Sequence, residues 1–169
     1  QRIDRALEDL KSILKSSEGL AAYPVESFIA IIRELGQYLP DNASYDSLFE
    51  VIVELTKRRT SEAEAGQVLL QRGIQKLRAG KNYDAIRLLG RAQQQLAFEE
   101  FRGEHFTALL ACGSAYEAAG LLWAARASLV GAANLAFSEF TARGTILPQA
   151  LTCLRRLAWM EIQLGRVPQ

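Results

Sequence analysis

Apolar residues recur at intervals of three or four along most of this chain, which is the spacing of one face of an α-helix. The first such stripe consists of Ile3, Leu7, Leu10 and Leu14. No segment shows sustained alternation of apolar and polar residues, and β-branched residues are sparse after residue 60. Because half-buried strands need that alternation, the pattern predicts an all-α protein.

Capping signals help to place the helix boundaries. Ser61 with Glu64 has the spacing of a capping box. Ser47 with Glu50 has the same spacing, and Asp46 is an alternative cap there. We expect about eight helices, at about 2–15, 24–38, 44–58, 62–79, 82–99, 104–119, 122–139 and 147–164.

An internal repeat is the strongest feature of the sequence. Residues 66–96 read GQVLLQRGIQKLRAGKNYDAIRLLGRAQQQL, residues 106–136 read FTALLACGSAYEAAGLLWAARASLVGAANLA, and the two align at an offset of 40. Identical residues coincide at Leu69 and Leu109, Gly73 and Gly113, Gly80 and Gly120, Ala85 and Ala125, Leu89 and Leu129, and Ala92 and Ala132. A third copy starts at Ala150 and Leu151, with Leu154, Leu157, Ala158 and Gly165 in register. Such a repeat predicts stacked helix–turn–helix units.

The small residues of the repeat each have a physical role in such a unit. A glycine within a helix costs ~1 kcal/mol relative to alanine, so Gly73 and Gly113 predict that the paired helix approaches closely there. Gly80 and Gly120 fall at a helix C-terminus, where a positive φ costs glycine nothing. The four aligned alanines keep the second helix of each unit thin where it meets its neighbours.

The repeat resembles the tetratricopeptide repeat (TPR) family, in which Leu-Gly, Tyr, Gly, Ala, an aromatic residue and Ala stand at fixed offsets. The copy at 106–136 has residues of this pattern at Gly113, Tyr116, Gly120, Ala125 and Ala132. The copy at 66–96 has them at Gly73, Gly80, Ala85 and Ala92. The departures from the pattern are Lys76 in place of Tyr, and Ala158 and Glu161 in place of Gly and Tyr in the last copy. The period of 40 and then 45 also exceeds the family's ~34 residues.

The resemblance implies a right-handed α-solenoid of antiparallel helix pairs. Residues 61–169 would hold the repeats, at about 66–99, at 106–140 and in a truncated copy from 150. Residues 1–60 would form a capping helix followed by a degenerate helix pair. We interpret the chain as a helical-repeat domain excised from a larger protein.

The composition is that of one globular unit. With 169 residues, 49% of them hydrophobic and 23% charged, the chain can bury a core without metals or disulfides. Its 20 basic and 19 acidic residues leave a net charge of +1, which disfavours a general polyanion-binding protein. The first 65 residues carry 8 basic and 12 acidic residues, and the remainder 12 and 7. A basic face and basic residues scattered over solvated helices both fit this asymmetry.

The apolar stretch 106–137 is not expected to span a membrane. Glu117 and Arg126 interrupt it, and each uncharged piece is shorter than the ~18–20 residues that a spanning helix needs. No secretory signal is visible, and Cys112 and Cys153 form neither a CxxC motif nor a disulfide framework. We therefore expect a cytoplasmic protein.

The sequence offers little support for an enzyme. The single histidine, His105, has no recognisable catalytic motif around it, and Cys112 lies at an inward helix position that suits a small buried residue. Glu99, Glu100 and Glu104 are better explained as a solvated cluster than as paired catalytic carboxylates. No phosphate-binding loop, dinucleotide-binding motif or metal-ligand spacing is present, so we expect no cofactor and no metal.

Resemblance to the family implies a concave groove lined by the first helix of each unit. Its candidate lining residues are Leu70, Ile74, Leu110, Ser114, Glu117, Arg155, Arg156, Trp159 and Ile162. Arg155 and Trp159 place a cation beside an aromatic ring, a combination common in binding hot spots. The alternative is that Trp159 packs against a following helix. Trp123, at the start of a second helix, is expected in the core.

One subtype of the family can be argued against. Its chaperone-binding members hold a C-terminal carboxylate with Lys, Asn and Arg side chains. The corresponding positions here are Leu70, Ile74, Ala111, Thr152 and Arg156, of which only Arg156 fits. Recognition of a chaperone's acidic tail is therefore not expected.

The leading hypothesis is a non-catalytic protein–protein interaction module. Its groove would bind a peptide or helix of a protein partner, which can be another domain of the same chain. The alternatives are a self-associating scaffold, which would form a homo-oligomer through 106–140 or the open C-terminal face, and an intramolecular regulatory or sensor segment. RNA recognition needs a basic and aromatic lining, and this lining is mainly apolar, so no nucleic acid is expected.

Overall fold

The computed structural model describes residues 2–16 and 25–165, and within them the chain is entirely helical, with no strand. The eight α-helices are α1 (Arg2–Lys15), α3 (Val25–Tyr38), α4 (Ala43–Arg59), α5 (Glu62–Arg78), α6 (Asn82–Gln95), α7 (Arg102–Ala118), α8 (Leu122–Arg143) and α9 (Ala150–Gln163). A 3-10 turn, η1 (Glu99–Phe101), precedes α7. The all-α prediction is confirmed.

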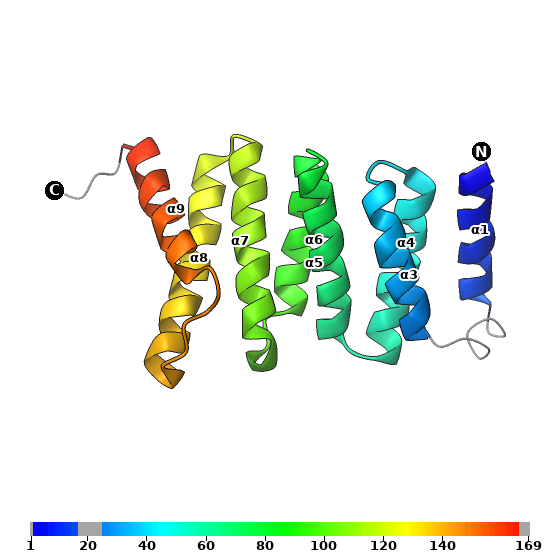
Figure 1. Cartoon of the computed structure of the whole chain (residues 1–169), viewed down its shortest axis with the longest axis horizontal. Helices are drawn as coiled ribbons and strands as arrows, with labels where there is room; N and C mark the ends of the chain where they lie inside the picture. Colours follow the sequence, from blue (N-terminus) through cyan, green and yellow to red (C-terminus); the bar gives the residue numbers. More distant parts are fainter. Residues whose placement is uncertain (1, 17–24, 166–169) are drawn as a thin grey trace.

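The helices stand side by side in one row, with α1 at one end and α9 at the other (Figure 1). From α4 onward each helix packs against the next one in the chain, and α1 packs against α4. In addition, α5 contacts both α3 and α7. The helices α3, α5 and α7 therefore lie next to one another, and they build one side of the row.

Two helix starts test the capping predictions. Ser61 Oγ accepts a hydrogen bond from the backbone N–H of Glu64 at 3.1 Å, which confirms the predicted cap of α5. The start of α4 at Ala43 is close to the expected residue 44, but the predicted cap at Ser47 or Asp46 is wrong, because Asn42 is the N-cap. Asn42 Oδ1 accepts from the N–H of Tyr45 at 2.8 Å, and the Asn42 amide donates to Asp4 of α1. This earlier cap leaves Asp46 free to make the ion pairs described below.

The repeat glycines lie where neighbouring helices come closest. A Cβ built at Gly73 would lie 2.6 Å from Cγ of Leu89 on α6, and one at Gly113 would lie 3.2 Å from Cγ of Leu129 on α8. The aligned alanines are fully buried at Ala85, Ala92, Ala125 and Ala132. The expected close approach of the paired helices is therefore present.

The turns between paired helices depend on glycine. Gly80 and Gly120 have φ of 73° and 75°, and Gly165, after α9, has φ of 69°. Such left-handed values are strained for residues with a Cβ, so glycine at the helix end is required by the backbone.

Trp123 is exposed over 61% of its surface, so the expectation that it lies in the core is wrong. The buried stripe of α8 runs through Ala125, Leu129 and Ala132. A residue two positions before Ala125 is turned about 200° around the helix, and therefore points away from that stripe.

None of the helices in the described ranges is long and apolar enough to cross a membrane.

Alanine substitutions at the two mid-helix glycines should have unequal effects. Alanine gains ~1 kcal/mol of helix propensity over glycine at either site. At Gly113 the neighbouring Leu129 must yield only slightly, so Gly113→Ala should change the free energy of unfolding by less than about 1 kcal/mol. At Gly73 the overlap with Leu89 is severe, and Gly73→Ala should destabilise by about 1–3 kcal/mol. Urea unfolding measures both, with Gln94→Lys as an exposed control, and equal effects would contradict the packing described here.

Candidate binding groove

A hollow of about 540 Å³ lies between α3 and α5. Ala30, Ile31, Arg33, Glu34 and Gln37 line it from α3, and Gln71, Ile74, Gln75 and Arg78 line it from α5. Its lining combines three apolar residues, Ala30, Ile31 and Ile74, with six polar or charged ones. The guanidinium Nε of Arg33 donates to the side-chain oxygen of Gln71, which ties the two walls together.

A second hollow of about 270 Å³ lies beside the first and reaches α9. Its lining includes Ile74, Leu77 and Arg78 of α5, Leu110, Ala111 and Ser114 of α7, and Thr152 and Arg156 of α9. Ile74 and Arg78 belong to both hollows. The two hollows therefore adjoin at α5, and we call the two together, with their linings on α3, α5, α7 and α9, the inner groove.

The C-terminal wall of the inner groove is fixed by Arg156. Its Nη1 donates to Ser114 Oγ at 2.8 Å, and its Nη2 pairs with Glu117 Oε2 at 2.7 Å. Ser114 Oγ in turn donates to the carbonyl oxygen of Leu110. These bonds join α7 to α9, and they occupy the one side chain that matched the chaperone-binding pattern.

The structure brings together Ile74, Leu110, Ser114 and Arg156 of the predicted lining, with Glu117 bonded to them. Leu70 is buried in the core beneath. Arg155, Trp159 and Ile162 are exposed on α9 and line neither hollow.

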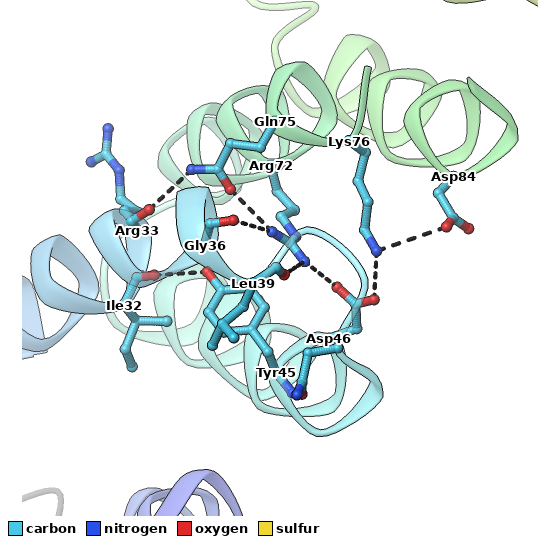
Figure 2. A network of polar contacts seen from close by, with 11 residues as sticks. Ile32, Arg33, Gly36, Leu39, Tyr45, Asp46, Arg72, Gln75, Lys76 and Asp84 are labelled. Carbon is cyan, nitrogen blue, oxygen red and sulfur yellow. Dashed lines mark hydrogen bonds and ion pairs between the residues drawn. The ribbon is translucent and has the colours of Figure 1, made fainter. Parts of the chain in front are cut away.

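Beside the inner groove lies a cluster of charged residues whose two cations, Arg72 and Lys76, are buried (Figure 2). Arg72 on α5 is 1% exposed and donates to the carbonyl oxygens of Gly36 and Leu39 and to Gln75 Oε1. Its Nη2 also pairs with Asp46 Oδ1 at 2.6 Å. Because the last carbonyls of a helix have no partner within it, Arg72 completes the end of α3.

Lys76, one turn further along α5, is 2% exposed. Its Nζ lies 2.6 Å from Asp46 Oδ2 and 3.8 Å from Asp84 Oδ2 on α6. The single carboxylate of Asp46 therefore joins two cations from successive turns of α5, and the cluster connects α3, α4, α5 and α6.

The ring of Tyr45 packs against the guanidinium group of Arg72. Arg72 Cζ lies 4.3 Å from the centre of the Tyr45 ring, within cation–π range, and the Tyr45 hydroxyl donates to the carbonyl oxygen of Ile32 at 2.7 Å. Burial raises the pKa of Tyr45 to about 12, with the nearby Arg72 acting in the opposite direction.

Sequence reasoning missed this cluster. It noted Lys76 only as a departure from the expected Tyr, and it assigned no role to Arg72. The available signal was that Arg72 and Lys76 align with Cys112 and Tyr116, which are inward positions. Two cations at inward positions one turn apart indicate a buried acidic partner, but they do not identify it.

Burial shifts the two cysteines and the histidine toward their neutral forms. Burial raises the pKa of the Cys112 thiol and of the Cys153 thiol, which disfavours their reactive thiolate forms. Burial also lowers the pKa of His105, which favours its neutral form. In the part of the chain that the structure describes, no three His, Cys, Asp or Glu side chains gather closely enough to hold a metal ion.

Comparisons with family models, with curated proteins and with solved structures gave no match. The resemblance to the TPR family therefore depends on the residues quoted above.

Removing the shared carboxylate should be costly. Asp46→Ala leaves Arg72 and Lys76 buried without their closest counter-charge, and should lower the free energy of unfolding by about 2–4 kcal/mol. Asp84→Ala, at a longer and more exposed pair, should cost less than about 1 kcal/mol. Urea denaturation at neutral pH compares the two. Similar losses would show that Asp46 has no special role.

Tyr45 should make the protein sensitive to alkali. Between pH 10 and about pH 12 the unfolded chain loses the Tyr45 proton while the folded chain keeps it. The unfolded state then binds fewer protons, so stability falls as the pH rises. Melting temperatures measured across this range should fall less steeply for Tyr45→Phe than for the wild type, although the variant starts lower because it lacks the bond to Ile32. Parallel slopes would contradict this assignment.

Proposed function

We propose that the protein is a non-catalytic binding module that holds a peptide or helix of a protein partner in the inner groove. One observation carries the proposal: the two hollows share Ile74 and Arg78, so they adjoin and together extend over four helices. A groove of this kind suits an elongated ligand better than a compact small molecule. The partner can be a separate protein or another domain of the same polypeptide.

The proposal includes the finer architecture, a right-handed α-solenoid of antiparallel helix pairs similar to TPR arrays. Contacts between α5 and α6 support it, because Gly66 meets Leu96 while Gly73 meets Leu89. Residue numbers therefore rise along one helix as they fall along the other. Stacked pairs of this kind leave one helix of each pair facing a common groove.

The charges of the inner groove favour a ligand with acidic residues. Among the described residues that line it are Arg33, Arg78 and Arg156 against one acidic side chain, Glu34, and Arg156 is neutralised by its ion pair with Glu117. Among the described residues, Arg33 and Arg156 have hydrogen-bond partners, whereas Arg78 makes no hydrogen bond or ion pair. Arg78 is also exposed, so we assign it the contact with a ligand carboxylate.

A self-associating scaffold is the second candidate. Large apolar side chains are exposed near the C-terminal end of the row, at Trp123, Phe137, Ile146, Leu151 and Trp159. Exposed apolar groups in such number are a feature of association surfaces. Sedimentation over a range of concentrations tests this candidate, because only self-association makes the mass depend on concentration.

The groove hypothesis can be tested with a peptide library displayed on phage and selected on the full chain. Selected peptides would then be titrated against the wild type and Arg78→Glu, and against Arg87→Glu as the control. Arg87 is exposed on α6, outside the inner groove, and the substitution changes the charge equally. We expect Arg78→Glu to weaken binding about tenfold or more and Arg87→Glu about twofold at most.

Two results would contradict the groove assignment. Equal weakening by both variants would indicate a general charge effect. Loss of binding in Arg155→Glu/Trp159→Ala together with retention in Arg78→Glu would move the site to the exposed face of α9.

A further inference from the structure

The residues of α9 that are buried against the preceding helix stand at the same repeat positions as those of α7. Cys153 and Met160 are fully buried against α8, and Cys153 Sγ lies 3.5 Å from the carbonyl oxygen of Leu129. At the offset of 45 these residues correspond to Ala108 and Ala115, which are also fully buried. The face of α9 that meets the preceding helix therefore matches the equivalent face of α7.

The opposite face of α9 is different. Leu151 is 79% exposed, Leu154 is 50% exposed, and Ala158 is exposed as well. Their spacing of three and four residues places them in one stripe along the helix. We call this stripe the outer α9 face.

The same positions are covered in the two preceding units. Ala158 corresponds to Gly113, which meets Leu129 of α8, and to Gly73, which meets Leu89 of α6. Leu154 corresponds to Leu109, whose side chain lies 3.4 Å from a Cβ built at Gly131. In both units the covering element is the second helix of the pair. The structure thus contains two examples of what packs on this face.

We propose that the outer α9 face binds an amphipathic helix carrying the pattern Ala-x3-Leu-x2-Ala, with its leucine seated over Ala158. Both covering helices have this pattern, as Ala85, Leu89, Ala92 and as Ala125, Leu129, Ala132. The two alanines let the helix come close, and the leucine fills the space above the small residue. This inference concerns a different surface from the inner groove and does not depend on it.

A second copy of the same α9 is a poorer occupant. A two-fold axis through the middle of the outer α9 face would bring Arg155 close to Arg155 of the other copy, because this residue flanks the stripe near its midpoint along the helix. Like charges in contact destabilise such a pairing. The helices that carry the proposed pattern, α6 and α8, are already packed within the fold.

The probe for the test is a fluorescent peptide with the sequence of residues 82–96, NYDAIRLLGRAQQQL, which contains the pattern. Its binding to the full chain is followed by fluorescence anisotropy. The same peptide with Leu89→Asp is the peptide control. The protein variants are Leu154→Asp on the outer α9 face and Ile31→Asp, an equally apolar exposed position in the inner groove. Both positions are exposed, so circular dichroism should show that both variants remain folded.

We expect saturable binding of the probe that weakens about tenfold or more with Leu154→Asp or with the control peptide, and changes about twofold at most with Ile31→Asp. Equal binding by wild type and Leu154→Asp, or no saturation up to about 1 mM, would overturn the proposal. A dimer that Leu154→Asp abolishes, detected by sedimentation without peptide, would also overturn it and assign the face to a second copy. Arg78→Glu should leave this binding unchanged, which separates it from the test of the inner groove.

Discussion

The carboxylate of Asp46 binds two cations that are almost wholly removed from water, Arg72 and Lys76. Transferring such groups from water costs several kcal/mol each unless they are paired and hydrogen-bonded. Here the pairing is combined with the carbonyl oxygens at the end of α3, so that one interaction connects α4 to α5 and completes α3 at the same time. The position of α3 against α5 defines the larger hollow of the inner groove. The shape of the groove therefore depends on a polar cluster that lies outside it.

The other end of the row is held differently. Around α7 and α8 the core contains Leu129 and Ala132, and the two helices come close together at Gly113. The positions equivalent to Arg72 and Lys76 are occupied here by the uncharged residues Cys112 and Tyr116. In the first half one carboxylate pairs with two buried cations, whereas in the second half the packing of small and branched residues is combined with separate ion pairs, Arg102–Glu139, Arg126–Glu161 and Arg156–Glu117.

Periodicity and the repeat predicted the helices well, because both depend on local spacing that the sequence displays directly. The repeat register also predicted the close approach at Gly73. Four of the residues that the family resemblance implies for a groove, Ile74, Leu110, Ser114 and Arg156, lie together in the second hollow. The register did not predict that Arg33 and Arg78 line the groove. Arg33 lies on α3, which is outside the aligned copies. Arg78 lies within a copy, but the sequence alone does not show whether an arginine side chain is exposed. The ion pairs of Asp46 were inaccessible for a similar reason: Asp46 and Lys76 are 30 residues apart, and no local pattern connects them. The expectation that Trp123 lies in the core was wrong because it gave more weight to the large apolar side chain than to the position of the residue on the helix.

Ile74 and Arg78 are shared by both hollows, and this has a consequence for the proposed ligand. A segment long enough to occupy both hollows meets the second at a high effective concentration once the first is filled. The part of the ligand in each hollow then needs little affinity of its own, because the two hollows bind the ligand together. Short fragments of the true partner would bind weakly even if the intact segment bound tightly, and affinity would rise steeply with length until both hollows were spanned.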